Sequence, residues 1–361
     1  MRLTGLAVRG FRNLAGLELE IPAEGVVVVG GNGQGKTNLL EAIYYLMLFR
    51  SLRGAKDREL VQFGEPGFWV RGTAADETSR NIQVGVRYEL STARKVVFLD
   101  GAEVRKLGDA VGQILAVPFG PADSEIVSGT PGIRRRFLDV VLSVSRPGYL
   151  VRLLEFRHAL RQRNAALRRG RAQEARVFDR PLAEAAAFVA GSRRAWVEEW
   201  RERFGELCAA MGEPAAADLR YASQVEDSGS AEAWWERFEH SAERDLRSGT
   251  TTVGPHRDDL KIGLGGRDIR FYGSAGQRRT AAIALRVLEA ETLTRYRGTA
   301  PVGLYDDVFA ELDEDRQGRL LELLRVSLPG QAIVVAPRDA EVPAKLFDRP
   351  RWQIRGGQIV R

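Results

Sequence analysis

The stretch VVVVGGNGQGKTNLLEAIYYL, residues 26–46, joins three local patterns in one segment. Four consecutive valines at 26–29 are β-branched and apolar, which is typical of a strand buried on both faces. The glycines that follow favour a tight loop, because glycine adopts backbone conformations that other residues avoid. From Thr37 to about Met47 the apolar side chains recur at helical spacing. The segment therefore predicts a buried strand, a glycine loop and an amphipathic helix.

The loop between this strand and this helix has the spacing of a phosphate-binding P-loop. Gly30 is followed after four residues by Gly35, Lys36 and Thr37. Backbone N–H groups of such a loop point at phosphate oxygens, and the helix start adds the positive end of its dipole. We expect Lys36 to reach the β- and γ-phosphates and the Thr37 hydroxyl to bind Mg²⁺. The predicted nucleotide-binding residues are Gly30, Gly31, Asn32, Gly33, Gln34, Gly35, Lys36, Thr37, Asn38, Ser274, Gly276 and Gln277. The alternative is a glycine-rich turn with a surface lysine.

A second segment, VGLYDDVFAELD at 302–313, supplies adjacent acids after an apolar strand. Asp306 stands where a P-loop site needs a carboxylate anchor for Mg²⁺. Asp307 is the predicted catalytic carboxylate, because a carboxylate beside the γ-phosphate orients or deprotonates the attacking water. The alternative is a pair of helix-capping acids.

The third segment, FYGSAGQRRTAAIALRVLEAETL at 271–293, predicts a long helix capped by Ser274. Its first turn carries Gly276 and Gln277, so its free N–H groups form a second surface suited to phosphate. Two such cradles on different lobes do not easily meet on one nucleotide within one chain. We therefore expect two chains to face each other, the Ser274 helix of one closing over ATP held by the P-loop of the other. An ordinary capped helix is the alternative.

Composition limits the class of protein. The apolar segments are too short to span a bilayer, and the start MRLTGLAVRGF lacks the apolar region of a secretory signal. Cys208 is the only cysteine, which excludes a disulfide framework and favours the cytoplasm. The net charge of +6 comes mostly from arginine, which suits phosphate contacts and also an ordinary solvated surface.

The chain divides into three regions that differ in predicted secondary structure. The first, to about residue 125, predicts strands at 3–11, 17–21, 26–29, 82–90 and 95–106, the last with a turn at Asp100-Gly101. The middle, about 130–250, predicts helices rich in arginine, glutamate and alanine. The remainder alternates helix and strand and ends in a hairpin at Gly356-Gly357.

Two apolar stripes in the middle region have the spacing of a coiled-coil seam. The first comprises Leu150, Leu153, Leu154, Leu160 and Leu167, and the second comprises Leu182, Ala186, Val189, Trp196, Val197, Trp200, Phe204 and Leu207. A break near Gly170 and a helix start at Asp179 and Pro181 separate them. The stripes predict either an antiparallel helical arm or a plain helical subdomain.

Arginines in this middle region are candidates for DNA contact. Three follow a helix start at 134–136, where positive charge opposes the helix dipole and an external anion relieves that cost. Others crowd the first arm helix: Arg157, Arg161, Arg163, Arg168, Arg169 and Arg171. We predict backbone-phosphate contacts from Arg134, Arg135, Arg161, Arg168 and Arg169. Solvated helix faces with glutamate partners are the alternative.

The order of the P-loop, the S-x-G-Q segment, the two acids and the ELD at 311–313 resembles the ABC-type ATPases. More narrowly, LAVRGFRNL, GTPGIRRRFLD, TVGPHRDDL and GSAGQRRTAAIAL resemble the RecF family, SMC-like ATPases of DNA replication and repair. The resemblance spans nearly the whole chain. It implies an α/β P-loop head, lobe I, from residues 1–125 and 295–361, with a mainly helical lobe II at 126–294 that carries the signature motif and a short antiparallel arm.

The resemblance also implies a function. Members bind ATP with Mg²⁺, dimerise on ATP, bind DNA, hydrolyse ATP weakly and work with RecR and RecO in loading RecA at gapped DNA. A subunit of a membrane transporter is the alternative function, but roughly 240 residues between the P-loop and Gly276 leave room for a DNA-facing insertion. A GTPase or phosphotransferase is the other rival, and the sequence lacks the Asn/Thr-Lys-x-Asp base reader of GTPases.

Four features depart from the wider ABC pattern or stay unassigned. Asp307 stands where many relatives have glutamate, and its shorter reach predicts slow turnover. The strand QAIVVAP, residues 331–337, has no histidine where a γ-phosphate sensor is expected. The Q-loop glutamine stays unassigned, with Gln62, Gln83 and Gln113 available. His256 invites an acid–base role, whereas the alternative is a turn whose Arg and Asp neighbours hold the two lobes together.

Overall fold

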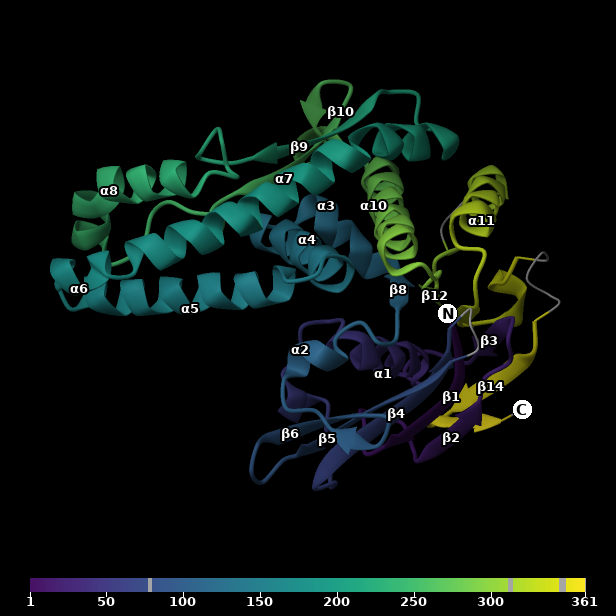
Figure 1. The fold of residues 1–361 in the computed structure, drawn as a ribbon. Coiled ribbons are helices and arrows are strands. Elements are labelled where there is room, and N and C mark those ends of the chain that lie inside the picture. Colours follow the sequence, from purple (N-terminus) through teal and green to yellow (C-terminus); the bar gives the residue numbers. More distant parts are fainter. Residues whose placement is uncertain (77–79, 311–313, 344–348, 361) are drawn as a thin grey trace. The chain divides into compact units, whose positions relative to one another are not determined.

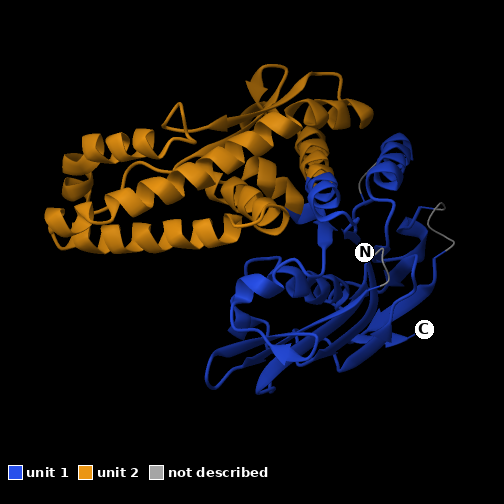
Figure 2. Cartoon of the chain, in the orientation of Figure 1, with its two compact units in different colours: residues 1–122, 289–361 blue, residues 123–288 orange. Residues whose placement is uncertain are grey.

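The computed structural model describes residues 1–76, 80–310, 314–343 and 349–360. The chain forms two compact units, Met1–Ala122 with Glu289–Arg361, and Asp123–Leu288 (Figure 2). The sequence-based boundaries lie at 125/126 and 294/295, a few residues from these divisions. Among the residues that the structure describes, no helix combines the length and apolarity needed to cross a membrane.

Unit 1 contains an antiparallel six-stranded sheet with the strand order β2-β1-β4-β5-β6-β7 (Figure 1). Its strands are β1 (Arg2–Arg9), β2 (Leu17–Glu20), β4 (Gly67–Ala75), β5 (Asn81–Glu89), β6 (Arg94–Leu99) and β7 (Ala102–Glu103). Asp100 and Gly101 make the turn between β6 and β7, both with positive φ, as a two-residue hairpin requires. The predicted hairpin at this turn is confirmed.

The second sheet of unit 1 is parallel apart from its edge strand β15, with the order β15-β14-β3-β13-β12-β8. Its strands are β3 (Gly25–Val29), β8 (Ala116–Phe119), β12 (Val302–Asp306), β13 (Ala332–Ala336), β14 (Arg351–Arg355) and β15 (Gln358–Val360). Val26, Val27 and Val28 are at most 1% exposed, which confirms the buried strand. β3 pairs with β13 and β14, so the two ends of the chain build one sheet.

Helix α1 (Lys36–Leu48) packs between these two sheets. It contacts β4 and β5 of the first sheet and β8, β12 and β13 of the second. The expected amphipathic helix is therefore buried on most sides, and nine consecutive residues, from Leu39 to Met47, are buried. The other described helices of unit 1 are α2 (Leu107–Ala110), α11 (Glu314–Ser327), η1 (Asp57–Glu59) and η3 (Asp339–Glu341).

Unit 2 is mainly helical with one small sheet. Its helices are α3 (Ser124–Ser128), α4 (Pro131–Ser145), α5 (Tyr149–Arg168), α6 (Ala172–Arg176), α7 (Asp179–Ala210), α8 (Ala231–Ser248) and α9 (Ile269–Tyr272). η2 (Pro121–Asp123) and α10 (Ala275–Arg297) run across its boundaries. The sheet joins β9 (Ala217–Ala222), β10 (Asp259–Leu264) and β11 (Arg267–Asp268) in the order β11-β10-β9. Strand β9 corrects the expectation of helix throughout 130–250, since it is stabilised by pairing with β10.

The predicted helical arm corresponds to α5 and α7, which lie side by side with α6 between them in sequence (Figure 1). Every residue of the second predicted stripe is buried on α7. The first stripe is partly wrong, because Leu154 is 50% exposed and Phe156 is buried instead. α8 and β9 also pack on α7, so this pair of helices is built into a helical subdomain.

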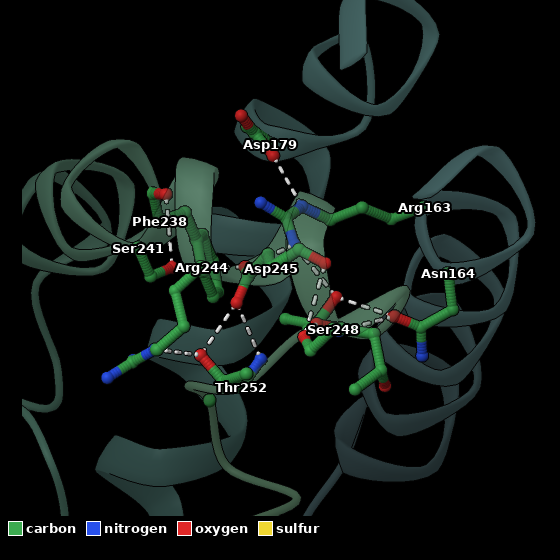
Figure 3. Close-up of polar contacts among 12 residues, drawn as sticks. Arg163, Asn164, Asp179, Phe238, Ser241, Arg244, Asp245, Ser248 and Thr252 are labelled. Atoms are coloured by element: carbon green, nitrogen blue, oxygen red, sulfur yellow. Dashed lines mark hydrogen bonds and ion pairs between the residues drawn. The ribbon is translucent and has the colours of Figure 1, made fainter. Parts of the chain in front are cut away.

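Arg163 of α5 lies at the centre of a buried polar network in unit 2 (Figure 3). Its guanidinium lies 2.7 Å from Asp179 Oδ1 at the start of α7 and 2.7 Å from Asp245 Oδ2 on α8. It also donates to Thr251 Oγ1 at 2.8 Å. Arg163 therefore joins three helical segments, and its buried charge is satisfied by two carboxylates.

Candidate functional site

The carboxyl ends of β3, β13 and β12 meet at one edge of the parallel sheet. Val28 lies opposite Val335, which in turn lies opposite Asp306. The P-loop follows β3, and Asp306 ends β12. Ligands of parallel α/β sheets bind outside the carboxyl ends of the strands, so this edge is the candidate site.

The P-loop holds the conformation that a phosphate cradle needs. Gly33 and Gly35 have φ values of 76° and 111°, in the region that favours glycine. The first N–H groups of a helix have no intrahelical partner. Gly35, the N-cap of α1, provides no side chain to cap them. Such a helix start is suited to an anion.

Lys36 lies inside this loop and is 8% exposed. Its Nζ donates to the carbonyl oxygens of Gly30 at 2.5 Å and Gly31 at 2.9 Å. Burial lowers the pKa of Lys36, and the charges of Asp306, Asp307 and Glu341 act in the opposite direction. The ammonium group is thus held over the loop, among carboxylates.

Thr37 and Asp306 are brought together at this edge. The Thr37 hydroxyl donates to Asp306 Oδ2 at 2.8 Å. Burial raises the pKa of Asp306, the hydrogen bond from Thr37 opposes that rise, and the charge of Asp307 adds to it. A hydroxyl and a carboxylate oxygen side by side are hard ligands of the type that Mg²⁺ prefers.

Asp307 follows directly in an uncommon backbone conformation, with φ at 50°. Its N–H donates to Val335 O at 3.0 Å, which ties this conformation to β13. Positive φ in a residue other than glycine costs about 1 kcal/mol or more and persists where the surrounding structure imposes it, often at functional sites. The ELD motif at 311–313 lies outside the described residues.

Other residues that brace the P-loop were not identified from the sequence. Asn13 Nδ2 donates to Gly33 O at 3.0 Å, and Asn13 Oδ1 accepts from Asn38 Nδ2 at 2.7 Å. Gly356 N donates to Gln34 Oε1 at 2.6 Å, so the predicted hairpin between β14 and β15 supports the loop. A Cβ at Gly357 would lie 1.8 Å from Asn13 O, so only glycine fits there.

Glu41, on the first turns of α1, is the second unpredicted feature near the loop. It is fully buried and lies within ion-pair distance of Arg12 and Arg53. Burial raises its pKa, but hydrogen bonds from Arg53, Arg12 and Ser51 outweigh that effect and leave the pKa lowered. The carboxylate therefore fixes α1 to the two flanking loops, a contact between distant residues that no local pattern signals.

The signature segment of unit 2 has a reciprocal cap at the start of α10. Gln277 N donates to Ser274 Oγ at 3.2 Å, and Ser274 N donates to Gln277 Oε1 at 2.9 Å. Gln277 Nε2 also donates to Glu213 Oε1 at 3.1 Å. The predicted capping by Ser274 is confirmed, and Gly276 lies in the first turn of the capped helix.

The structure contradicts the DNA-contact prediction for Arg134. Its side chain is 3% exposed and pairs with Asp259 through two hydrogen bonds, at 2.7 and 3.0 Å. Arg135 is half-buried and donates to Asp258 O at 2.6 Å. Both guanidiniums therefore fix α4 to the start of β10, because a buried charge needs a partner inside the protein.

Arg161, Arg168 and Arg169 are exposed on α5 or at its carboxyl end. In the described ranges, these three have no carboxylate within ion-pair distance, unlike Arg152, which pairs with Glu155 on the same helix. Arg157 instead pairs with Asp139, and Arg171 with Glu174. The three arginines remain candidates for an external anion.

His256 lies in the loop before β10. Its Nε2 lies 3.1 Å from Thr251 O, and burial lowers its pKa to about 4. The neighbouring Asp258 accepts from Tyr221 at 2.7 Å. These contacts favour a structural turn, but they lie within unit 2, so the expectation that this turn holds the two lobes together is not supported.

The three candidate Q-loop glutamines lie in different parts of unit 1. Gln83 lies in β5 of the antiparallel sheet, and Gln113 Nε2 donates to Asp109 O at 3.0 Å. Gln62 N donates to Gly10 O at 2.8 Å. By contrast, Gly120 follows β8, and a Cβ there would lie 3.3 Å from Asp306 Cβ. Gly120 therefore lies beside Asp306, and the Q-loop glutamine stays unassigned.

Comparison with known proteins gives a consistent result over the whole chain. The model of the RecF/RecN/SMC N-terminal domain matches residues 2–345. The DNA replication and repair protein RecF of Anaeromyxobacter sp. (strain Fw109-5) is 38% identical over 368 residues, covering 99% of each chain. RecF of Myxococcus xanthus is 35% identical, covering 99% of this chain and 97% of the relative.

Solved structures agree with the sequence comparisons. The recombination mediator protein RecF in its ATP complex matches with a TM-score of 0.90 and 32% identity, covering 99% of this chain and 97% of that chain. An SMC head bound to the C-terminal winged-helix domain of ScpA matches with a TM-score of 0.57 at 15% identity, which shows a shared fold. The predicted P-loop ABC-type ATPase head is therefore confirmed. The chain belongs to the RecF family of DNA replication and repair proteins, within the RecF/RecN/SMC N-terminal domain family.

Proposed function

We propose that this chain is a cytoplasmic, ATP-dependent DNA-binding protein of recombinational repair and replication restart. The observation that carries the proposal is the meeting of the P-loop, Lys36 and the Thr37–Asp306 pair at one sheet edge. Relatives solved as RecF with ATP, and described as recombination mediators in the RecFOR pathway, support ATP as the nucleotide.

The residues of the site fit a magnesium nucleotide. The backbone of Gly31–Gly35 and the start of α1 bind the phosphates, and Lys36 releases its carbonyl partners to meet the β- and γ-phosphates. Thr37 and Asp306 would hold Mg²⁺, which would supply positive charge to neutralise the phosphate oxygens. Asp307 orients the attacking water and takes up its proton, and its short side chain makes hydrolysis weak. We propose that DNA stimulates this hydrolysis.

We further propose that ATP acts as a switch for pairing. Ser274, Gly276 and Gln277 of one subunit close over ATP bound to the P-loop of the other, since the capped start of α10 presents N–H groups to an anion. The homodimer clamps DNA, with Arg161, Arg168 and Arg169 on backbone phosphates, and hydrolysis reopens it. RecR and RecO are the proposed partners in loading RecA at gapped DNA.

Light scattering with and without Mg·ATP, followed by a DNA shift assay, tests this function. We expect monomers without nucleotide, dimers with it, and tighter DNA binding in the dimer. Monomers at saturating Mg·ATP, in a variant that cannot hydrolyse it, would contradict the switch.

A further inference from the structure

Arg338 follows strand β13, whose carboxyl end lies at the edge of the sheet where the P-loop lies. β13 is paired on one side with β3 and on the other with β12. Gly30 N donates to Ala336 O at 3.3 Å, which places the end of β13 against the first residue of the P-loop. Arg338 follows two residues later and is the N-cap of η3.

Glu341, the last residue of η3, connects Arg338 to the site. The charge of its carboxylate acts to raise the pKa of Lys36, after the larger effects of burial, Asp306 and Asp307. Arg338 Nε donates to Glu341 Oε1 at 2.6 Å. The guanidinium is thus held beside a carboxylate that acts on Lys36, the residue placed to meet the terminal phosphates.

A phosphate can displace the Glu341 carboxylate from its ion pair with Arg338. The Arg338 side chain is 80% exposed, and that of Glu341 is 27% exposed. An exposed ion pair contributes little to stability, because water screens it. A guanidinium on a phosphate makes stronger, bidentate hydrogen bonds to a group of higher charge.

We propose that Arg338 binds the γ-phosphate of the ATP held by its own subunit, at the place where the sequence has no sensor histidine after β13. The inference rests on the proposed binding of ATP at the P-loop. On ATP binding, Arg338 exchanges the Glu341 carboxylate for γ-phosphate oxygens. In one class of P-loop proteins, an arginine of the same chain stabilises the charge that develops on the transferred γ-phosphoryl group in the transition state. Because ADP lacks that phosphate, Arg338 makes the site bind ATP more tightly than ADP.

Titration calorimetry of the full chain with Mg·ATP and with Mg·ADP tests the assignment. We expect Arg338→Ala to lower ATP affinity by about 10-fold or more while ADP affinity changes less than about 2-fold. Arg338→Lys should recover part of the ATP affinity, since it keeps the charge and loses the bidentate geometry. Glu341→Gln should raise ATP affinity, because it removes a competing negative charge.

Arg325→Ala is the matched control. Arg325 lies on α11, is 74% exposed and pairs with Glu322 three residues away at 2.7 Å, as Arg338 does with Glu341. The Arg325→Ala substitution should leave the affinities for ATP and ADP unchanged. Equal losses of ATP and ADP affinity in Arg338→Ala, or unchanged ATP affinity, would overturn the role of Arg338 but leave the proposed function standing. If the wild type bound neither nucleotide while folded by circular dichroism, the proposed function and this inference would both fail.

Discussion

Thr37 donates its hydroxyl hydrogen to Asp306 Oδ2 at 2.8 Å, although 269 positions separate them in the chain. The contact exists because β3 and β12 both pair with β13 in parallel, which brings their carboxyl ends to one edge. It joins the P-loop and the acidic strand into one site.

Removing the P-loop lysine should strongly weaken nucleotide binding. Lys36→Met takes away the ammonium that is buried at Gly30 and Gly31, so its charge-assisted bonds to phosphate are lost. We expect nucleotide affinity to fall by about 10- to 100-fold, for ATP and ADP alike. Equilibrium binding of a fluorescent ATP analogue measures it, with exposed Lys106→Met as the control.

Asp307→Asn should stop hydrolysis and leave the protein folded. Asparagine tolerates the positive φ of 50° at this position, so the backbone keeps its shape while the proton acceptor is lost. We expect phosphate release to slow by about 100-fold or more. Light scattering with Mg·ATP should then show a persistent dimer, and a variant that turned over ATP at the wild-type rate would exclude Asp307 as the base.

Ser274→Arg should block pairing without blocking ATP binding. The bulky cation would stand at the capped start of α10, in the surface proposed to face the partner's nucleotide. Ser274→Ala is the comparison, since it removes the hydroxyl and its cap, at a cost of about 1 kcal/mol, without adding bulk or charge. Nucleotide titration together with light scattering measures both effects. A Ser274→Arg protein that still dimerised with ATP would contradict the composite site.

Neutralising the three exposed arm arginines should weaken DNA binding. Replacing Arg161, Arg168 and Arg169 by glutamine removes up to three phosphate contacts, so the slope of log affinity against log salt should become less negative by up to about 2.7. Fluorescence anisotropy of a labelled duplex over a salt series measures it. Arg152→Gln on the same helix is the control, because Glu155 already pairs with Arg152. An unchanged slope would exclude these contacts.

The Arg134–Asp259 pair should control stability instead of DNA affinity. Arg134→Gln removes the two hydrogen bonds that the guanidinium makes to the Asp259 carboxylate and leaves Lys261, at 3.2 Å, as its remaining ion-pair partner, so we expect a loss of about 1.5 to 3 kcal/mol in the free energy of unfolding. Urea denaturation measures this loss. DNA affinity per folded molecule should be unchanged, and a selective loss of DNA binding at wild-type stability would restore the original prediction for Arg134.

The same pair predicts a direction for pH dependence. Burial raises the pKa of Asp259, but the hydrogen bond and charge of Arg134, with those of Lys261, outweigh it and leave the pKa lowered. A lowered folded-state pKa means that the stabilisation is present above the unfolded value of about 3.9 and is lost as pH falls through the folded value. Denaturation between pH 5 and 2 should therefore show the wild type losing more stability than Arg134→Gln.

Local patterns in the sequence were sufficient to predict the strand, the loop and the helices that form the site. The valine run, the glycine loop and the helix after it are each specified by neighbouring residues, and the structure has β3, the P-loop and α1 in those places. The same holds for the cap of Ser274, which depends on a residue only three positions away. Patterns of this kind are readable because propensity and spacing act over a few residues.

Contacts between distant segments were decided only by the tertiary structure. The sequence pattern made Arg134 a candidate for DNA contact, but folding brings it to Asp259, 125 positions away, where a buried ion pair is formed. Arg163 is likewise buried against Asp179 and Asp245 on two other helices. An arginine looks the same in sequence whether its partner is water, a phosphate or a remote carboxylate, because burial and pairing depend on which elements pack together.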